Sequence, residues 1–361
     1  MKRLLIGFCL VSLILISACV VHDTSIASRS LKFEQIESGT NQPSNQIAIK
    51  WRVLHPPVDY FLEAAKTFKL ELENLSDGEL TVEIIVVNET QIPNSGVIAQ
   101  EAEEMILNGT TDMMQIGISN LVEYNLDLLI LTSPYMFTSD EHVDLVVDGE
   151  IGDELLREIN NSKLKALAFT FSGGFETIVS KRSDIKKLSD LKGQRALVYG
   201  PDFGILANEL GMEIVPAIKK DNWTKEIPDS LAAGIEGDLI DAWEQTAQDA
   251  KGMLDQGVSK SIINSNHRVW FTVLAINREF FDGLSTEQQH IVEQAAKKAA
   301  IAERHAISSD GKKALSQYSY LENELSKEDI ELLKDVKEKA IATRLKNVDP
   351  AMLKKIVESS P

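Results

Sequence analysis

The sequence is poor in cysteine and in long apolar runs. Its two cysteines, Cys9 and Cys19, both stand near the N-terminus. Because no cysteine follows Cys19, disulfides cannot stabilise the rest of the chain, and a packed core has to do so. The apolar run from Leu4 to Ile16 is too short for a good transmembrane helix.

Residues 1–18 nevertheless have the composition of a signal peptide. Lys2 and Arg3 precede the apolar run, and the small residues Ser17 and Ala18 come directly before Cys19. The letters "ISAC" resemble a bacterial lipobox, whose cysteine is acylated; an ordinary signal peptide with a chance cysteine is the alternative. We therefore predict that Cys19 is the lipid attachment site, that the polar residues 19–46 form a flexible tether, and that the protein is held on the extracytoplasmic face of a bacterial membrane.

Positive charge is also scarce. The 37 lysines and arginines face 55 acidic residues, so the net charge is −18, and loss of Lys2 and Arg3 with the signal peptide would make it −20. This excess disfavours nucleic acid and anionic membrane surfaces as partners. It does not exclude an anionic small ligand, because the charge inside a cleft can oppose the net charge.

The sequence shows no pattern typical of catalysis or of a cofactor. The six histidines are scattered without metal-site spacing, and no Gly-x-Ser-x-Gly motif is present. Asp241 and Glu244 could act as an acid and a base, but acids at a strand-to-helix junction explain the same residues. We expect no enzyme activity, no metal and no cofactor.

The hydrophobic pattern alternates between strands and helices, which predicts an α/β fold. Apolar residues alternate over 47–53 and follow helical spacing over 59–75. After Gly78, "LTVEIIVVN" is expected to be a strand whose apolar end suggests burial on both faces, as in a parallel sheet. The pattern restarts with strands expected at 165–171, 195–199, 213–215, 239–243 and 269–276. From Ser285 onward the chain reads as helical, with capping boxes at Ser285 and Ser326.

Five stretches, in order, resemble the solute-binding proteins of tripartite ATP-independent periplasmic (TRAP) transporters. The resemblance covers about residues 47–310, and the order and spacing of the stretches make it specific. The stretches are "EMILNGTTDMMQIGISNL" (104–121), "LLILTSPYMFTSDEHV" (128–143), "IKKLSDLKGQRALVYG" (185–200), "GDLIDAWEQT" (237–246) and "HRVWFTVLAINREFFDGLSTEQQ" (267–289).

The resemblance implies two α/β lobes of the Venus-flytrap type, joined by hinge strands and a long helix and followed by C-terminal helices. We expect the first lobe to comprise 47–170 plus 269–300, the second 171–268, and the C-terminal helical segment 301–361. The implied function is the capture of a small organic solute by closure of the cleft and its delivery to a membrane permease, by a protein expected to be a monomer.

At two positions the sequence departs from this family. Members usually hold the solute's carboxylate with an arginine whose aligned position is Leu197 here, and a second common cation is replaced by Glu176. A carboxylate desolvated beside Leu197 and Glu176 would lack compensation. An ordinary carboxylate clamp is therefore not expected.

Three explanations remain open. Arg195, two residues before Leu197, could reach the solute instead. Alternatively, the solute is neutral or cationic, with Glu176 and Glu244 as acceptors and Phe175 and Trp243 as cleft walls. Finally, the protein could have lost transport and act as an orphan or as a sensor that signals to a membrane receptor rather than to a permease.

Two further polar residues, Gln245 and Arg268, are candidates for contact with the solute. Gln245 aligns with a family amide and could hydrogen-bond a solute oxygen. Arg268, just before the last expected strand, is either a displaced cation or part of a surface ion pair.

Overall fold

The structure is a computed structural model that describes residues 46–53, 58–86, 104–160, 163–216, 234–235, 238–318 and 326–361. Met1–Pro43 and Ser44–Pro361 form separate units, and the described residues all belong to the second. The predicted signal peptide, the lipid attachment at Cys19 and all of the tether except Gln46 lie outside the described residues.

Strands and helices alternate along the chain, which confirms the predicted α/β class. The strands are β1 (Ile47–Val53), β2 (Leu80–Val86), β3 (Met113–Gly117), β4 (Leu164–Ser180), β5 (Arg195–Val198), β6 (Glu213–Pro216), β7 (Ala242–Thr246), β8 (Ser261–Ile263) and β9 (Val269–Asn277). The helices are α1 (Val58–Leu75), α3 (Leu128–Thr132), α4 (Asp140–Val147), α5 (Glu150–Ile159), α6 (Pro201–Glu209), α8 (Ala247–Asp255), α9 (Arg278–Asp282), α10 (Thr286–Ser316), α11 (Lys327–Thr343) and α12 (Pro350–Glu358). Short 3-10 turns occupy Ile118–Asn120 and Leu188–Leu191.

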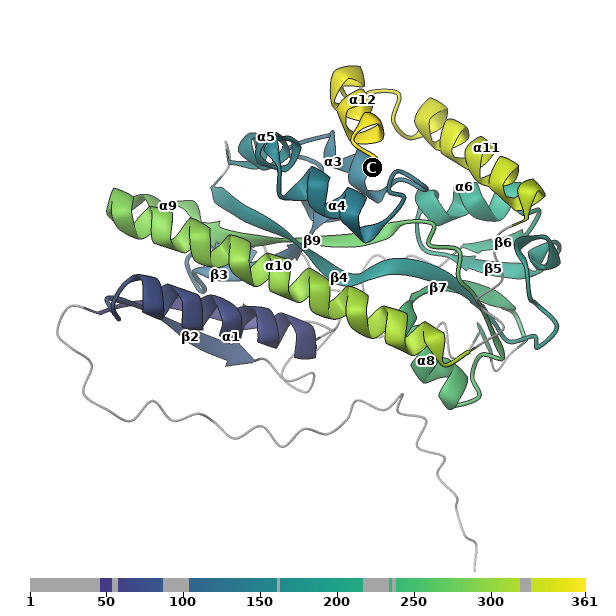
Figure 1. Ribbon diagram of the computed structural model, residues 1–361, viewed down its shortest axis with the longest axis horizontal. Helices are drawn as coiled ribbons and strands as arrows, with labels where there is room; N and C mark the ends of the chain where they lie inside the picture. The colour runs from purple at the N-terminus through teal and green to yellow at the C-terminus, as the bar shows by residue number, and fades with distance from the viewer. Residues whose placement is uncertain are drawn as a thin grey trace, which may run out of the picture. The chain divides into compact units, whose positions relative to one another are not determined.

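One mixed sheet holds these strands together in the order β2-β1-β3-β9-β4-β7-β5-β6, with β8 also paired to β4. The 17-residue strand β4 connects the two ends of the sheet, because its first part pairs with β9 and its last part with β7. Figure 1 shows α1, α8 and α10 on one side of the sheet and α3 to α6, α11 and α12 on the other.

Strand β4 continues well beyond the predicted end at Phe171. Gly173 and Gly174 have φ of +127° and +77°, a conformation that other residues rarely adopt, and the ladder with β9 shifts register at this point. A Cβ at Gly173 would lie 2.2 Å from Cγ2 of Thr246. The two glycines therefore allow one strand to bend and to serve both ends of the sheet.

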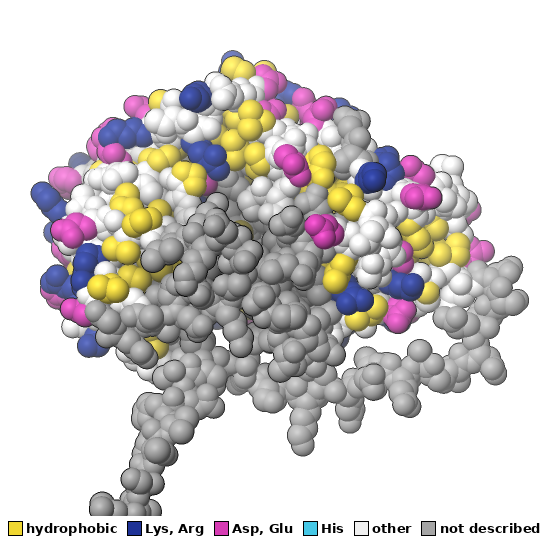
Figure 2. Space-filling model, turned by 180° about the vertical axis from the view of Figure 1, so that it is seen from behind, with side chains coloured by type: hydrophobic (Ala, Val, Ile, Leu, Met, Phe, Trp, Pro, Cys, Tyr) yellow, Lys and Arg dark blue, Asp and Glu magenta, His cyan; other side chains and the backbone are white. Residues whose placement is uncertain are grey.

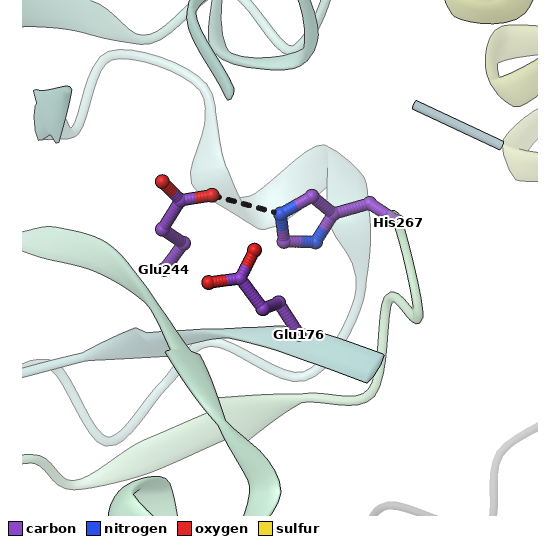
Figure 3. Close-up of side chains that lie close together, drawn as sticks. All are labelled: Glu176, Glu244 and His267. Carbon is purple, nitrogen blue, oxygen red and sulfur yellow. Dashed lines mark hydrogen bonds and ion pairs between the residues drawn. The ribbon is translucent and has the colours of Figure 1, made fainter. Parts of the chain in front are cut away.

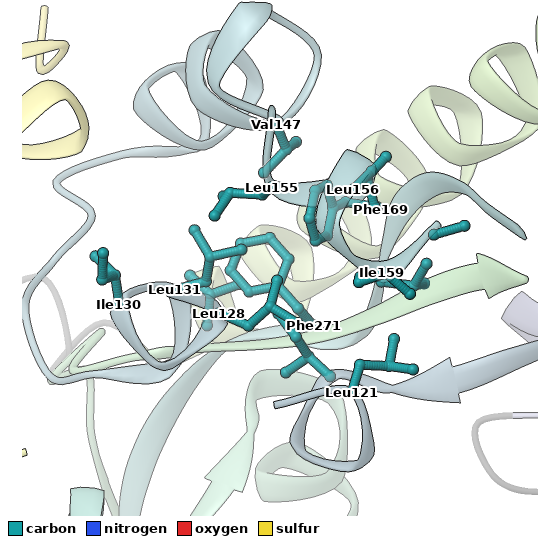
Figure 4. Packing of buried hydrophobic residues seen from close by; sticks show 14 of the residues in the cluster. Leu121, Leu128, Ile130, Leu131, Val147, Leu155, Leu156, Ile159, Phe169 and Phe271 are labelled. Atoms are coloured by element: carbon teal, nitrogen blue, oxygen red, sulfur yellow. The ribbon is translucent and has the colours of Figure 1, made fainter. Parts of the chain in front are cut away.

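Apolar side chains form two clusters on each side of the sheet. On α1, the predicted apolar face is largely confirmed, since Phe61, Ala65, Phe68 and Leu72 are buried, whereas Leu75 at the end of the helix remains 37% exposed. On the other side, Figure 4 shows Phe271 of β9 among Leu128, Leu131 and their neighbours.

Helix α10 crosses the sheet and contacts α1, β4 and α8. Its predicted capping box is confirmed, because Ser285 accepts from the backbone of Gln288 and the Gln288 side chain accepts from Ser285. The expected border at residue 300 falls inside this helix, and the division into lobes stays a prediction. None of the described helices has the length and apolarity needed to cross a membrane.

The surface of the described residues mixes both signs of charge despite the acidic composition. Figure 2 shows Lys and Arg side chains interspersed with Asp and Glu on one face. A hollow of about 780 Å³ between α4 and α10 is lined by acids such as Asp140 and Asp144. Both acids already have partners on α10, because Lys312 pairs with Asp140, and Arg304 pairs with Asp144, which His305 also contacts.

Candidate functional site

Two acidic side chains meet where β4, β7 and β9 come together. Glu176 on β4 lies opposite Thr246 of β7, and Glu244 of β7 lies opposite Ile178, so the two glutamates are near neighbours in the ladder. The backbone N–H of Glu176 donates to the carbonyl of Arg268, at 2.9 Å. Strand pairing therefore brings residues from three separate parts of the sequence to one place.

Arg268 connects the two carboxylates. Its Nε and Nη2 donate to the two oxygens of Glu244, at 3.1 and 3.0 Å, and its Nε also lies 2.5 Å from Oε2 of Glu176. The last contact is an ion pair without hydrogen-bond geometry, so Oε2 of Glu176 accepts no well-formed hydrogen bond from the described residues. The side chains of Glu176 and Glu244 are only 3% and 5% exposed, whereas that of Arg268 is 19% exposed.

His267 completes this group from the other side of Glu244. Its Nε2 lies 3.3 Å from Oε2 of Glu244, and its Nδ1 lies 2.8 Å from the hydroxyl of Ser265. Figure 3 shows the His267 ring and the carboxyl groups of Glu176 and Glu244 pointing toward one another. Since a carboxylate can only accept, Nε2 carries the proton and Nδ1 accepts from Ser265. The ring of Phe203 covers the imidazole at 5.6 Å.

A second ion pair adjoins this group. Asp202, in the first turn of α6, is buried and accepts from Nε of Arg344 at 3.1 Å, at the end of α11. Asp202 also interacts electrostatically with Arg268, Glu176 and Glu244. We call the six residues Glu176, Asp202, Glu244, His267, Arg268 and Arg344 the charged cluster.

Burial governs the protonation of the cluster. Desolvation, opposed by Arg268 but assisted by Glu244, raises the pKa of Glu176 to about 8. Burial would also raise the pKa of Glu244, but the Arg268 charge and the His267 hydrogen bond lower it overall. Burial lowers the pKa of His267 despite the nearby Glu244. At neutral pH the imidazole is thus uncharged, Glu244 is ionised, and Glu176 holds a proton.

The donor atoms of Glu176, Glu244 and His267 lie within 4.8 Å of one another, as the ligands of a metal ion would. Arg268 argues against that use of the site. Its Nε is 2.5 Å from Glu176 and 3.1 Å from Glu244, so the guanidinium occupies the space between the same oxygens. We therefore assign no metal to the cluster.

Of the site residues expected from the sequence, Glu176 and Glu244 lie in the charged cluster, and the others have different surroundings. Leu197 and Trp243 are buried in one apolar cluster, where the Trp243 indole donates to the sulfur of Met253. Phe175 is partly buried against another apolar cluster, and Gln245 is partly exposed on β7. Whether any of the four contacts a solute stays a prediction.

Arg195 lies apart from the cluster in its bonding. Its Nε and Nη2 donate to the two oxygens of Asp241, at 2.7 and 2.8 Å, and Nη2 also reaches Asp238. Arg195, the first residue of β5, is thus already paired with Asp241 and Asp238. Its use as a substitute clamp stays a prediction, one that would require those bonds to break.

The alternative of a surface ion pair for Arg268 is wrong, because its partners are buried. Sequence reasoning also missed Asp202, Arg344 and the cluster role of His267. The only available signal was the double departure at Glu176 and Leu197: an acid in place of a cation implies that another cation lies nearby. Locating that cation required the pairing of β4 with β9.

Comparisons with known proteins identify the family and the fold of the chain. Residues 54–347 match the family described as bacterial extracellular solute-binding protein, family 7. The 2,3-diketo-L-gulonate-binding periplasmic protein of Escherichia coli is 25% identical over 286 residues, which cover 79% of this chain and 80% of that protein.

Two solved structures show the same fold. A TRAP periplasmic solute-binding protein of Ochrobactrum anthropi superposes with a TM-score of 0.73 at 20% identity, over 87% of this chain and 95% of that one. A sugar acid-binding protein of Advenella mimigardefordensis, in complex with galactonate, gives 0.68 at 19% identity, over 87% and 98% of the two chains.

Proposed function

Because this chain belongs to family 7 of the bacterial extracellular solute-binding proteins, the TRAP solute-binding proteins, we propose that it captures a small organic solute outside the cytoplasm and delivers it to a TRAP permease. The single observation that carries the proposal is the family match over 54–347. The charged cluster supports it, because buried ionisable groups that converge on one place are typical of ligand sites.

The cluster lies where a closing movement would act on it. Strands β4 and β9 both extend through the point at which Gly173 and Gly174 bend the sheet. Glu176 and Arg268 stand directly beside that bend. If the two ends of the sheet rotate about it, a solute near Arg268 would be enclosed, which is the usual mechanism of hinge closure.

The solute that we propose is neutral or cationic. The diketogulonate- and galactonate-binding relatives bind acids. In this chain, the arginine that could receive a carboxylate is already shared by Glu176 and Glu244. A third carboxylate would enter a buried site without a cation of its own, at a cost of several kcal/mol.

Transport rather than catalysis is the expected role, and Cys19 is the proposed membrane anchor. Replacement of Cys19 by serine should move the protein from the membrane fraction to the soluble fraction and abolish its labelling by palmitate. Labelled palmitate on the serine variant would show that the lipid is attached elsewhere, and would contradict the anchor.

The function is tested by thermal unfolding of the chain from residue 19 onward, with Cys19→Ser, in a panel of small neutral, cationic and acidic solutes. A solute at a hundredfold excess over its Kd should stabilise the folded state by about 2.7 kcal/mol. Co-purification with a TRAP permease in the presence of that solute is expected. If the bound protein co-purifies with a receptor instead, the sensor alternative replaces the transport role; if no solute stabilises it, the proposed function fails.

A further inference from the structure

The charged cluster lacks one positive charge among the described residues. It contains three carboxyl groups, on Glu176, Asp202 and Glu244, and two guanidinium groups, on Arg268 and Arg344. His267 does not compensate, because it is fully buried and uncharged at neutral pH. Three acids and two permanent cations leave a deficit of one in a region where an uncompensated charge is costly.

The deficit is located at Glu176. Glu244 is fully engaged, since Arg268 donates to both of its oxygens and His267 donates as well. Asp202 has Arg344 as a partner. Glu176 shares the Nε of Arg268 with Glu244, and no described group donates a well-formed hydrogen bond to its Oε2. Glu176 is thus the acid that still requires a donor with positive charge.

We propose that the solute carries a protonated amine and that this amine pairs with Glu176. This inference rests on the proposed function and narrows its solute class. An ammonium group has three donors and one charge, which is what the cluster lacks. A divalent metal ion fits less well, because it needs several oxygens at short range, and Arg268 already lies between the available ones.

The protonation of the cluster supports this assignment. In the absence of a solute, the raised pKa of Glu176 lets a proton take the place of the missing cation. The charged groups around Glu176 are Arg268 beside β9, Glu244 on β7, Asp202 on α6 and, behind Asp202, Arg344. Binding of an amine should therefore release the proton held by Glu176, up to one per solute at pH 7.

The first test compares two sets of probes, each with an amine, a neutral and an acidic member on one skeleton. The sets are glucosamine, glucose and glucuronate, and 4-aminobutanol, butane-1,4-diol and 4-hydroxybutyrate. We expect each amine to bind at least tenfold more tightly than its neutral and acidic counterparts. Below pH 8, the affinity for the amine should increase up to tenfold for each unit by which the pH is raised, because Glu176 loses one proton when the amine binds. Calorimetry in two buffers of different ionisation enthalpy measures this proton release on the unmodified binding site.

Variants then assign the effect to Glu176. Glu176→Gln should lower amine affinity at least tenfold and abolish the proton release. Glu176→Ser serves if the glutamine variant does not fold. Glu303→Gln is the matched control, because Glu303 is also a buried acid with a raised pKa but bonds to Gln115 on β3. It should leave the amine affinity unchanged.

The outcomes separate the two proposals. Tighter binding of a neutral or acidic probe, amine binding without proton release, or a Zn²⁺-dependent gain in stability that Glu176→Gln removes would each overturn the amine assignment and leave solute binding intact. If the wider solute panel stabilises the protein but no amine does, the amine assignment alone is refuted. Absence of binding by every solute refutes both proposals.

Discussion

Replacement of Arg268 by methionine would test whether the charged cluster depends on that one cation. Methionine preserves an unbranched side chain but leaves the carboxyls of Glu176 and Glu244, 3% and 5% exposed, without their shared partner. Breaking a buried ion pair from one side typically costs about 3–5 kcal/mol. For a chain of this length, that corresponds to a fall in Tm on the order of 10 °C.

The loss of stability caused by Arg268→Met should increase with pH. Without Arg268 the pKa of Glu176 in the folded protein would rise further, and burial would raise that of Glu244, which the Arg268 charge now helps to keep low. Each carboxyl would then be protonated in the folded state and ionised in the unfolded one. Stability contributed by the protonated form is present at low pH and is lost as the pH rises. Arg268→Met should therefore be milder at pH 5 than at pH 8.

Urea unfolding followed by circular dichroism at pH 5 and pH 8 provides the measurement. Arg182→Met is the control, because Arg182 and its partner Asp184 are 53% and 63% exposed and solvent screens such a pair. If Arg268→Met costs no more than Arg182→Met at pH 8, or if its cost does not increase from pH 5 to pH 8, Arg268 does not neutralise the buried acids.

Two other substitutions probe the interior. Burial raises the pKa of Glu303 from its ordinary 4.5 to about 8, so the stability that its protonated form contributes is complete below pH 4.5 and is lost as the pH rises through 8. In urea titrations, Glu303→Gln should therefore be more stable than the original chain above pH 7. An equal difference in stability between the two at pH 5 and at pH 9 would contradict this. Leu197→Arg should lower the free energy of unfolding by several kcal/mol and create no carboxylate binding, because Leu197 packs in an apolar cluster with Trp243. If the arginine variant were as stable as the original chain and bound glucuronate, this side chain would instead lie in the cleft.

Local sequence patterns were sufficient to predict those strands and helices whose bounds depend mainly on their own residues. The alternation over 47–53 became β1 with the same bounds, and the capping box at Ser285 begins α10. The strand expected at 239–243 lies three residues later, at Ala242–Thr246, because its position is decided by pairing with β4 rather than by its own apolar run. Leu239, which suggested the earlier start, is 60% exposed.

Strand β4 shows how far pairing can extend a strand. The sequence pattern predicted a strand that ends at Phe171, two residues before Gly173 and Gly174. The structure instead uses them to bend a strand that continues to Ser180, because both flanking segments find partners, β9 before the bend and β7 after it. Such a choice depends on pairing between residues that are far apart in the sequence, from Ser180 with Ala242 to Leu164 with Asn277, which no local window contains.

The site shows the same limit with a different consequence. The sequence revealed that a cation was missing at 176 and 197, but only the pairing of Glu176 with Arg268 shows that a cation stands across the ladder instead. A buried site requires balanced charges but not a particular residue at a particular position. The cation can therefore come from another strand, provided that the acids that it neutralises lie next to it. Here two acids accompany one arginine, and Asp202 with Arg344 adds a balanced pair. The imbalance therefore persists after every described charge is counted, and it is this remaining carboxyl, rather than the absence of the usual arginines, that specifies what the solute must bring.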